Sequence, residues 1–566
     1  MADTLLIRAD ASSVRGTGHV FRCLALAQAW QDAGGNVVFV AAELPEALHA
    51  RLVAEKCGVE SVAAVAGSDE DAELTCALAR RMGAIWVVLD GYHFGAGYRQ
   101  RLRAGGLRIL LLDDDGTLGP YDVDAVLNQN LGAEAAWYAG SPEGTRLLLG
   151  SHLAMLRREF RGPASSRVTA ADEETHLLVS FGGADPVDLT GRVLQALTEV
   201  PVPGVRVRVL VGPANPRGDA LRQRAAAAGT PMEVVSAVTD MPAQLAWADL
   251  ALVGAGSTCW ELCRLGVPAL LVALADNQRP IARAMMAAGA GRDLGWHSEI
   301  TAAGLRSAIQ ELAGQPELRD RMARAGRAAV DGCGASRVAS FLRGSGRDLR
   351  GALRISVVVD NPHSWFHPYA AQLCERLKEW GEVRLRGSAD EIPPGGDLAF
   401  LLSCERKVPS AVLGRSRHNL VVHASALPQG RGMSPLTWQI LEGRDEIPLT
   451  LFEAVEAIDA GAIYGQAMVR YRGTELIGEL QAPLAARILD LCEEFVRHFP
   501  DSVTDGRAQL GEESRYRRRT AADSRLDPTL TLAEQFNLLR VVDNERYPAF
   551  FDWKGRRYEL RITAKD

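Results

Sequence analysis

The chain repeatedly alternates short apolar segments with longer segments whose apolar residues have helical spacing. The pattern begins with residues 4–8 and 24–30, starts again at 176–180 and starts a third time at 353–360. Uninterrupted apolar strands that alternate with helices are typical of parallel sheets covered by helices on both faces. At 566 residues the chain is also too long for one hydrophobic core. We therefore predict an α/β fold with several sheet-based domains.

Composition and charge exclude several classes of protein. The chain is 47% hydrophobic and 23% charged, as soluble globular proteins are, and its net charge of -7 gives no general attraction to nucleic acid. The nearest basic cluster, 515–519, is short enough to be a solvated surface. Nine cysteines without a Cys-x-x-Cys pair indicate reduced thiols, and the spacing of Cys259 and Cys263 fits two core positions on one helix. Without a signal peptide or a membrane-spanning apolar run, we expect a cytoplasmic protein that has no metal, nucleic-acid or membrane partner.

The first glycine-rich turn, Arg15-Gly16-Thr17-Gly18-His19, lies between a predicted strand and a predicted helix. Such a turn leaves backbone N–H groups unpaired at the start of the helix, and anions bind there. His19 stands at the mouth of the turn, and an imidazole titrates near neutral pH, so His19 is the first catalytic candidate. The alternative is a solvated turn histidine that has no catalytic role.

Two other predicted strands of this domain end in polar clusters. The clusters are Asp90-Gly91-Tyr92-His93 and 113–116, and each follows an apolar run. In parallel sheets, ligands bind beyond the carboxyl ends of the strands, so both clusters are candidates for a binding site. The alternative is that these acidic residues cap the helices that follow.

The second domain repeats the arrangement of a strand that opens into glycines. Residues 176–180 lead into Phe181-Gly182-Gly183-Ala184-Asp185, and a later strand leads into Gly256-Ser257-Thr258 before a helix-spaced run. Gly256, Ser257 and Thr258 are predicted to cap that helix and to offer its amino end to a diphosphate. Glu261 lies about one turn further, where its carboxylate can accept hydrogen bonds from ribose hydroxyls. The alternative is a glutamate that only complements the helix dipole.

Together these motifs resemble one family over residues 1–345. The residues that carry the resemblance are Gly16, Gly18, His19, Arg22, Asp90, Tyr92, Gly182, Gly183, Gly256, Ser257, Thr258, Glu261 and the run Asp276-Asn277-Gln278. The family is the UDP-sugar hydrolase of pseudaminic acid biosynthesis, which is similar in fold to the two-domain glycosyltransferases of the MurG type. The resemblance implies two Rossmann-like domains in the GT-B arrangement, at 1–165 and 166–345, with the substrate in the cleft between them and UDP held by the second.

The resemblance also implies roles for these residues. His19 activates a water molecule, and Tyr92 and Asn277 help to place the water and the sugar. The other matching residues, which include Arg22, Asp90 and Gln278, then contribute to the substrate site. Hydrolysis of a glycosyl diphosphate at the anomeric carbon needs a positioned water, a base for its proton and donors for the departing diphosphate. UDP is already an acidic leaving group, so this chemistry requires no metal, and the sequence offers no metal-ligand cluster.

A third domain is predicted after a linker at 346–352. We expect it to cover 353–500, with a small C-terminal subdomain at 501–566. Its dense motifs are His423-Ala424-Ser425, Leu427-Pro428, Arg431-Gly432 and Asp459-Ala460-Gly461. A histidine at a strand end and a carboxylate that comes later in the chain form a proton-relay pair if the two meet.

These motifs resemble the formyltransferases that use 10-formyltetrahydrofolate, over about residues 353–560. The resemblance implies that His423 and Asp459 handle protons while a substrate amine attacks the formyl carbon, and that His423 helps to stabilise the tetrahedral intermediate. The other residues that it places in the substrate site are Ser425, Arg431 and Gly432. The tail from 518 to 551 is similar to that of the sugar-nucleotide formyltransferases, which favours a sugar amine as the acceptor.

One position departs from the pattern of this second family, which usually has Asn-x-His. Val421 stands two residues before His423, and the nearest asparagine is Asn419. Asn419 would lie on the same face of the strand, roughly 6 to 7 Å further back. Losing one oxyanion donor typically costs about a hundredfold or more in rate. The domain is then a slow enzyme, an enzyme with a different arrangement of catalytic groups, or a degenerate binding module. The presence of the other motifs favours activity.

We therefore expect a bifunctional nucleotide-sugar enzyme of nonulosonic acid biosynthesis. Its third domain would formylate the 4-amine of a UDP-2-acetamido-4-amino-2,4,6-trideoxy hexose of the altro series, and its first two domains would then release UDP by hydrolysis. Two alternatives stay open: a glycosyltransferase that uses a UDP-sugar, and a hydrolase that carries a non-catalytic formyltransferase-like module. The sequence makes no prediction of the oligomeric state.

Overall fold

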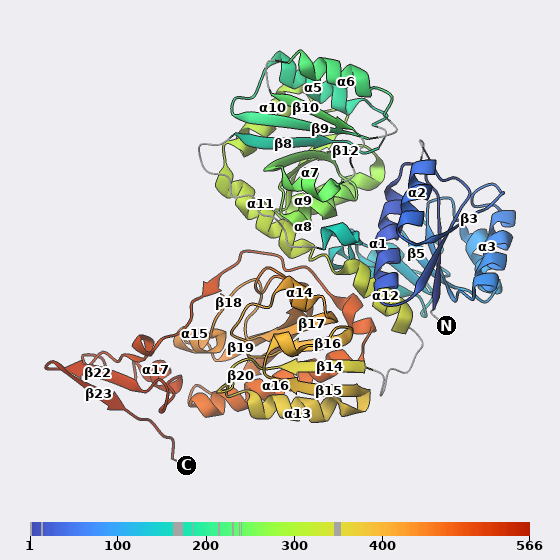
Figure 1. The fold of residues 1–566 in the computed structure, drawn as a ribbon. Helices are drawn as coiled ribbons and strands as arrows, with labels where there is room; N and C mark the ends of the chain where they lie inside the picture. The colour runs from blue at the N-terminus through green and yellow to red at the C-terminus, as the bar shows by residue number, and fades with distance from the viewer. Residues whose placement is uncertain are drawn as a thin grey trace. The chain divides into compact units, whose positions relative to one another are not determined.

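The computed structural model describes most of the 566-residue chain in two compact units, Met1–Arg343 (unit 1) and Gly344–Asp566 (unit 2; Figure 1). The described residues are 3–12, 15–161, 174–183, 185–212, 215–228, 231–236, 238, 240–344 and 353–565. The predicted linker at 346–352 and the predicted domain boundary at 165–166 lie outside them.

The first sheet of unit 1 has seven strands in the order β3-β2-β1-β4-β5-β6-β7, and all neighbouring strands are parallel. The strands are β1 (Thr4–Ala9), β2 (Asn36–Ala41), β3 (Gly58–Ser61), β4 (Trp86–Asp90), β5 (Arg108–Leu112), β6 (Ala125–Asn128) and β7 (Arg146–Leu149). The helices between them are α1 (Gly18–Asp32), α2 (Glu46–Ala54), α3 (Asp69–Met82) and α4 (Ala96–Ala104). Strand β4 is buried along its whole length, as expected of a strand covered on both faces.

The second sheet of unit 1 has six parallel strands in the order β10-β9-β8-β11-β12-β13. The strands are β8 (Thr175–Ser180), β9 (Val205–Val211), β10 (Met232–Ser236), β11 (Leu250–Gly254), β12 (Ala269–Ala273) and β13 (Gly291–Trp296). The helices are α5 (Leu189–Glu199), α6 (Gly218–Ala226), α7 (Met241–Ala246), α8 (Thr258–Leu265), α9 (Arg279–Ala287), α10 (Ala302–Ala313) and α11 (Pro316–Ala329). Cys259 and Cys263 are both buried on α8, as their spacing predicted. The two parallel sheets confirm the predicted α/β architecture of this part of the chain.

The last helix of unit 1, α12 (Gly334–Gly344), returns to the first sheet although it follows the second sheet in the chain. Its apolar residues belong to the buried cluster that contains residues of β1 and β2. Arg337 of α12 is fully buried and donates hydrogen bonds to the carboxylate of Asp331 and to the backbone oxygen of His152. Burial opposes the ionisation of Asp331, but the charge and hydrogen bonds of Arg337 outweigh it and hold the pKa of Asp331 below its ordinary value.

We expect the substitution Arg337→Met to lower the free energy of unfolding by about 3 to 5 kcal/mol, because it leaves a buried carboxylate without its partner. The folded-state pKa of Asp331 lies below its unfolded value, so the ion pair contributes stability at neutral pH and loses it as the pH falls through the acidic range. Chemical denaturation should therefore show the largest difference from wild type at neutral pH and a smaller one near pH 3.

The control for this prediction is Arg324→Met on α11, where an exposed arginine pairs with Asp320 one turn away. An exposed pair of this kind contributes less than about 1 kcal/mol. Equal losses in the two variants would show that the buried pair does not hold α12 in place.

Unit 2 contains a mixed six-stranded sheet in the order β15-β14-β16-β17-β19-β20. Strands β14 to β17 pair in parallel, whereas β19 and β20 are antiparallel to their neighbours. The strands are β14 (Leu353–Val358), β15 (Gly381–Arg386), β16 (Gly396–Leu401), β17 (Ser416–His423), β19 (Glu446–Glu453) and β20 (Ile463–Arg470). The helices are α13 (His367–Leu377), α14 (Ser410–Leu413), α15 (Pro435–Leu441), α16 (Ile477–Arg497) and α17 (Phe536–Arg540). Helices α13 and α16 pack against each other and share the main buried cluster of this sheet.

Two short strand pairs complete unit 2. Strand β18 (Arg431–Gly432) pairs in parallel with β21 (Arg515–Tyr516) and so ties the loop after β17 to the C-terminal part of the chain. Strands β22 (Ala549–Trp553) and β23 (Arg556–Leu560) form an antiparallel hairpin.

Candidate functional site

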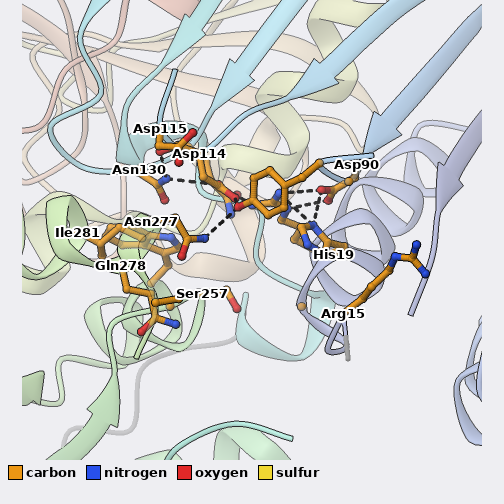
Figure 2. A pocket seen from close by; sticks show the side chains of 18 of the residues that line it. Arg15, His19, Asp90, Asp114, Asp115, Asn130, Ser257, Asn277, Gln278 and Ile281 are labelled. Carbon is orange, nitrogen blue, oxygen red and sulfur yellow. Dashed lines mark hydrogen bonds and ion pairs between the residues drawn. The ribbon is translucent and has the colours of Figure 1, made fainter. Parts of the chain in front are cut away.

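Unit 1 holds a cavity of about 720 Å³ at the carboxyl ends of its strands. Strand ends, loops and helices from both sheets of unit 1 contribute to its lining. The lining residues are Asp10, Arg15, Gly18, His19, Arg22, Asp90, Gly91, Tyr92, His93, Asp114, Asp115, Gln129, Asn130, Gly256, Ser257, Trp260, Ala275, Asn277, Gln278 and Ile281. Figure 2 shows His19 and Asp90 on one side of this cavity and Ser257, Asn277 and Gln278 on the other. A ligand in this cavity would therefore contact both halves of the unit.

His19 and Asp90 form a hydrogen-bonded pair on the first wall. His19 is the second residue of α1, and Asp90 is the last residue of β4. The distance from His19 Nδ1 to Asp90 Oδ1 is 2.6 Å. Burial opposes the ionisation of Asp90, but Arg22 and His19 outweigh it, so the pKa of Asp90 lies well below its ordinary value. The carboxylate therefore accepts from Nδ1–H, and the electron pair of a neutral imidazole is left on Nε2.

Arg22 lies one turn after His19 on α1 and joins two carboxylates. Its Nε donates to Asp90 Oδ2 at 2.6 Å, and its Nη1 donates to Asp114 Oδ1 at 2.7 Å. Burial also opposes the ionisation of Asp114, and the charge of Arg22 again overcomes it and lowers the pKa of Asp114. One guanidinium that serves two ionised carboxylates leaves a net charge of about -1 beside His19.

Tyr92 extends this network across the cavity. Its hydroxyl donates to Asp114 Oδ2 at 2.9 Å and accepts from Nδ2 of Asn277, also at 2.9 Å. The Tyr92 ring meets the His19 ring edge to face, with 5.5 Å between the ring centroids. Burial, followed by the charge of Asp114, raises the pKa of Tyr92 well above its ordinary value, so its hydroxyl remains protonated. The sequence-predicted residues His19, Tyr92 and Asn277 are therefore brought together.

The glycine-rich turns of the two halves face each other beside this network. A Cβ built on Gly18 would lie 4.0 Å from Oγ of Ser257, and one built on Gly183 would lie 3.9 Å from Oγ1 of Thr17. Helices α1 and α8 both begin here, and neither start is capped by a side-chain hydrogen bond. At α8 the N–H groups of Cys259 and Trp260 already donate to the backbone oxygens of Gly256 and Ser257. The positive ends of the two helix dipoles still favour an anionic ligand, so this end of the cavity suits a phosphate or diphosphate.

The predicted residues divide into those that line the cavity and those beside it. The lining ones are Gly18, His19, Arg22, Asp90, Tyr92, Gly256, Ser257, Asn277 and Gln278, and the others are Gly16, Gly182, Gly183, Thr258 and Glu261. Glu261 accepts a hydrogen bond from Arg157 at 2.9 Å. Burial raises the pKa of Glu261, and Arg157 offsets the rise only in part. To bind a ribose, Glu261 would have to share its carboxylate with Arg157.

A second histidine–aspartate pair lies in the same cavity, and only its histidine belonged to one of the predicted clusters. His93 Nε2 lies 2.9 Å from Asp10 Oδ2, and Arg8 Nη1 lies 2.8 Å from the same carboxylate. Burial opposes the ionisation of Asp10, but His93 and Arg8 outweigh it and keep its pKa well below the ordinary value. A signal existed in the sequence, because Asp10 directly follows β1 just as Asp90 ends β4. Asn130, which donates to Asp114, had a similar signal, because it lies two residues after the end of β6.

In unit 2, His423 ends strand β17 and is nearly buried. Its Nε2 lies 2.9 Å from the backbone oxygen of Gly430. A carbonyl oxygen only accepts, so Nε2 carries a proton, and the electron pair of the neutral ring is on Nδ1. His423 can therefore take a proton at Nδ1, but in its neutral form it has no second N–H to donate.

Asp459 and His423 have no direct hydrogen bond among the described contacts of unit 2, but both are bound to the same short loop. Asp459 Oδ2 accepts from the backbone N–H of Gly432 at 2.9 Å, two residues beyond the Gly430 that binds His423. Gln509 holds the other side of this aspartate, because its side-chain amide donates to the backbone oxygen of Asp459 at 2.9 Å. Asp459 also has φ of +53°, a conformation that non-glycine residues adopt only when their surroundings impose it.

The side chain of Arg431, which was predicted to bind substrate, is hydrogen-bonded to other residues of unit 2. Its Nη1 donates to Glu513 at 2.6 Å and its Nη2 donates to Gln509 at 2.7 Å. Arg431 is buried, so its observed contacts position the loop between His423 and Asp459.

The position of the missing family asparagine is apolar here. Val421 packs against Leu427, Phe452 and Ile463. Asn419 lies further back on β17, where its Nδ2 donates to the backbone oxygen of Leu413 at 2.8 Å. Neither side chain is available as an oxyanion donor beside His423.

Two family models match this chain. Residues 177–332 match the glycosyltransferase family 28 C-terminal domain, and residues 389–487 match formyl transferase. The chain therefore joins a glycosyltransferase-like α/β portion to a formyltransferase-like α/β portion, as its two resemblances implied.

Individual relatives match only parts of the chain. The spore coat polysaccharide biosynthesis protein SpsG of Bacillus subtilis (strain 168) is 28% identical over 200 residues, which are 35% of this chain and 58% of the relative. The chain thus spans little more than half the length of this relative. Among solved structures, MurG of Acinetobacter baumannii is 19% identical and covers 61% of this chain and 99% of its own, with a TM-score of 0.45. A 4-N formyltransferase from Francisella tularensis is 15% identical, and the match covers 38% of this chain and 99% of that protein, with a TM-score of 0.33. At such scores the structural likeness carries no conclusion about activity.

The described residues contain neither a membrane-spanning helix nor a group of metal-binding side chains. No helix in these ranges is long and apolar enough to cross a membrane. Within the same ranges, no three His, Cys, Asp or Glu side chains are grouped to hold a metal ion.

Proposed function

We propose that the chain is a bifunctional enzyme that formylates the 4-amine of a UDP-2-acetamido-4-amino-2,4,6-trideoxy hexose and then hydrolyses the bond from the sugar to UDP. One observation carries the proposal. The same chain matches a formyltransferase family and also contains a glycosyltransferase-like unit whose cavity holds the His19–Asp90 pair. A formylated amino sugar made by unit 2 is a substrate for unit 1, so the two reactions follow in sequence.

In unit 1, the sugar would lie beside His19 and the diphosphate near the start of α8. A water molecule forms a bond to the anomeric carbon, and Nε2 of His19 takes its proton. The bond from the anomeric carbon to the phosphate oxygen breaks, and UDP departs with the electron pair. Asp90 stabilises the imidazolium, and the net charge near -1 around Arg22 stabilises the positive charge that develops on the sugar ring. Tyr92 and Asn277 would hold the water and the sugar in place.

In unit 2, an amine of the sugar would attack the formyl group of 10-formyltetrahydrofolate. The donor set fits such a substrate, because Nδ1 of neutral His423 can accept the proton that the amine loses. Asp459 lies on the other side of the same loop and can assist in proton transfer. The folate is a co-substrate here and is consumed in each turnover.

The first experiment is mass spectrometry of the full-length protein incubated with the UDP-linked 4-amino sugar, with and without 10-formyltetrahydrofolate. We expect free UDP and a 4-formamido sugar only when the folate is present. Equal release of UDP without folate would show that unit 1 ignores the 4-substituent, and the proposed order would then be wrong.

The match to glycosyltransferase family 28 favours a second candidate, in which unit 1 transfers the sugar to an alcohol. The same incubation separates the two. Free reducing sugar in the absence of any acceptor supports hydrolysis, whereas intact UDP-sugar that is consumed only after an acceptor is added supports glycosyl transfer.

Val421 favours a third candidate, in which unit 2 only binds and does not catalyse. A substrate that is already acylated at the 4-amine tests it. Hydrolysis of this substrate together with no folate-dependent formylation of the free amine would support a binding module.

A further inference from the structure

His93, the histidine of the second pair in the cavity of unit 1, has no part in the hydrolysis proposed above. We propose that His93 is a sugar-binding residue, and that its Nδ1 accepts a hydrogen bond from a hydroxyl or amide N–H of the substrate sugar. The inference rests on the proposed function of unit 1, because it takes the ligand of this cavity to be a UDP-sugar. It adds a group that holds the sugar to the groups that act at the anomeric carbon.

The first argument concerns the two ring nitrogens of His93. Its Nε2 lies 2.9 Å from Asp10 Oδ2. Asp10 is ionised, as described above, so its carboxylate only accepts and Nε2 carries the proton. In the neutral ring Nδ1 then has an electron pair and no hydrogen. Asp10 therefore fixes Nδ1 as an acceptor.

The second argument is that this acceptor is unoccupied and accessible. Nδ1 of His93 has no hydrogen-bond partner among the described residues. It is also not one of the buried polar atoms that lack a partner in the described part of the chain, and 19% of the side chain is exposed. Since His93 lines the cavity, a ligand there can reach Nδ1 without any rearrangement of the protein.

The contact with Asp10 serves to orient the ring of His93. Asp10 already accepts from the backbone N–H groups of residues 42 and 43, at 2.7 and 3.1 Å, and Nη1 of Arg8 lies 2.8 Å from it. The carboxylate therefore has three other donors and does not need the histidine. The ring also packs against Phe94, with 4.1 Å between the ring centroids. A polar group that its surroundings hold in one orientation is preorganised to bind a ligand.

Nδ1 of His93 lies close to the residues that act at the anomeric carbon. A Cβ built on Gly91 would be 3.0 Å from Nδ1, and Gly91 directly follows Asp90, which binds His19. Consecutive Cα atoms are only about 3.8 Å apart. Strands β1 and β4 also pair side by side, with Ala9 opposite Asp90, so both histidine–aspartate pairs lie at one edge of the sheet. A sugar that is placed at His19 is therefore also near His93.

The charge around His93 favours a sugar group over a phosphate. Behind the ring, Arg8 pairs with both Asp10 and Asp71, so the formal charge of these three groups is negative. A negative neighbour and a ring nitrogen that accepts both disfavour an anion. Sugar hydroxyls and amide N–H groups are neutral donors, and they match this acceptor. The diphosphate is instead expected at the start of α8, in the other half of unit 1.

Two substitutions of His93 separate the functions of its ring nitrogens. In His93→Gln, the amide nitrogen stands the same number of bonds from Cβ as Nε2, so it keeps the contact with Asp10, but no atom replaces Nδ1. In His93→Asn, the amide oxygen takes the position of Nδ1 and the contact with Asp10 is lost. A sugar contact at Nδ1 predicts a defect in the first variant and rescue in the second. A purely structural role predicts the reverse.

The measurement is the Kd of the UDP-linked 4-formamido sugar, determined by calorimetric titration of the full-length protein. All samples carry His19→Gln, so that the ligand is hydrolysed only slowly during the titration. We expect the further change His93→Gln to raise Kd about tenfold, which is the effect of losing one neutral hydrogen bond. His93→Asn should stay within threefold of the parent. UDP alone should bind equally to all samples, because it has no sugar, and this also shows that the variants are folded.

A second ligand identifies the donor on the sugar. An analogue with an ester in place of the 4-formamido group keeps the carbonyl and lacks the N–H. If His93→Gln no longer weakens binding of this analogue, the donor is the amide at C4. If the tenfold effect persists, the donor is another N–H or hydroxyl of the same sugar. Either result supports the contact.

The remaining outcomes separate the inference from the proposed function. An unchanged Kd of the UDP-sugar in His93→Gln refutes the inference, and so does an equal loss of affinity for UDP alone. Weaker binding in His93→Asn with none in His93→Gln also refutes it, because the histidine would then serve Asp10. A protein that binds the UDP-sugar but releases no UDP when His19 is intact refutes the proposed hydrolysis, while the affinities still test His93. A protein that binds no UDP-sugar refutes both.

Discussion

The variant His19→Gln is expected to release UDP from the 4-formamido substrate about 10³-fold more slowly than the wild-type enzyme. Nε2 of His19 is the proposed base for the attacking water, and general bases contribute about 10²- to 10⁴-fold. The pair with Asp90 adds to this, because the buried carboxylate fixes the tautomer and stabilises the imidazolium. The side chain of His19 is mostly but not fully buried, at 17% exposure, so glutamine should fit without unfolding the unit.

The measurement is the rate of UDP release under single-turnover conditions, which reports the chemical step. His49→Gln on α2 is the control, since His49 is exposed and lies outside the cavity. The same His19→Gln sample should still formylate the free amine, so the UDP-linked 4-formamido sugar should accumulate. A wild-type rate of UDP release would remove His19 from the mechanism, and a loss of both reactions would indicate damage to the whole chain.

The sequence predicted the main elements of the cavity because its signals are local. A strand that opens into glycines places Gly18 and Gly256 at helix starts, and a carboxylate at a strand end places Asp90 at the carboxyl edge of the sheet. These features depend on a few neighbouring residues and on the general geometry of parallel sheets. The observed strands β1 and β8 agree with the predicted segments 4–8 and 176–180 to within one residue.

Pairings between distant residues could not be predicted in the same way. Arg22 binds both Asp90 and Asp114, and nothing in the spacing of these three residues along the chain specifies that arrangement. The same holds for α12, whose return to the first sheet depends on a buried pair between Arg337 and Asp331. Both arrangements are set by tertiary packing, which a local pattern does not contain.

Unit 2 shows the same limit at its proposed site. The motifs located His423 and Asp459, but they did not indicate that the loop between 430 and 432 would bind both residues. The hydrogen bond from His423 to Gly430 decides which ring nitrogen is free, and it depends on the loop conformation. The departure at Val421 was visible in the sequence, whereas the packing of Val421 against Leu427, Phe452 and Ile463 was not.

A second large effect is expected for His423→Gln, which should lower the rate of formyl transfer about 10³-fold. In the neutral ring Nδ1 is the proton acceptor, and a glutamine amide oxygen is too weak a base to replace it. Glutamine can still donate to the backbone oxygen of Gly430, so the loop should keep its conformation. The expected loss is therefore chemical and should appear in kcat, with a smaller change in KM.

The measurement follows formylated UDP-sugar by mass spectrometry, and His498→Gln, an exposed residue at the end of α16, is the control. With the free 4-amino sugar and folate, His423→Gln should leave the UDP-linked amine largely unchanged. With an already acylated substrate, it should release UDP at the wild-type rate, because unit 1 is untouched. This pattern is the reverse of that expected for His19→Gln, so the two variants together assign one reaction to each unit. Formyl transfer at the wild-type rate in His423→Gln would instead place the base on another residue, and Asp459 would be the next to test.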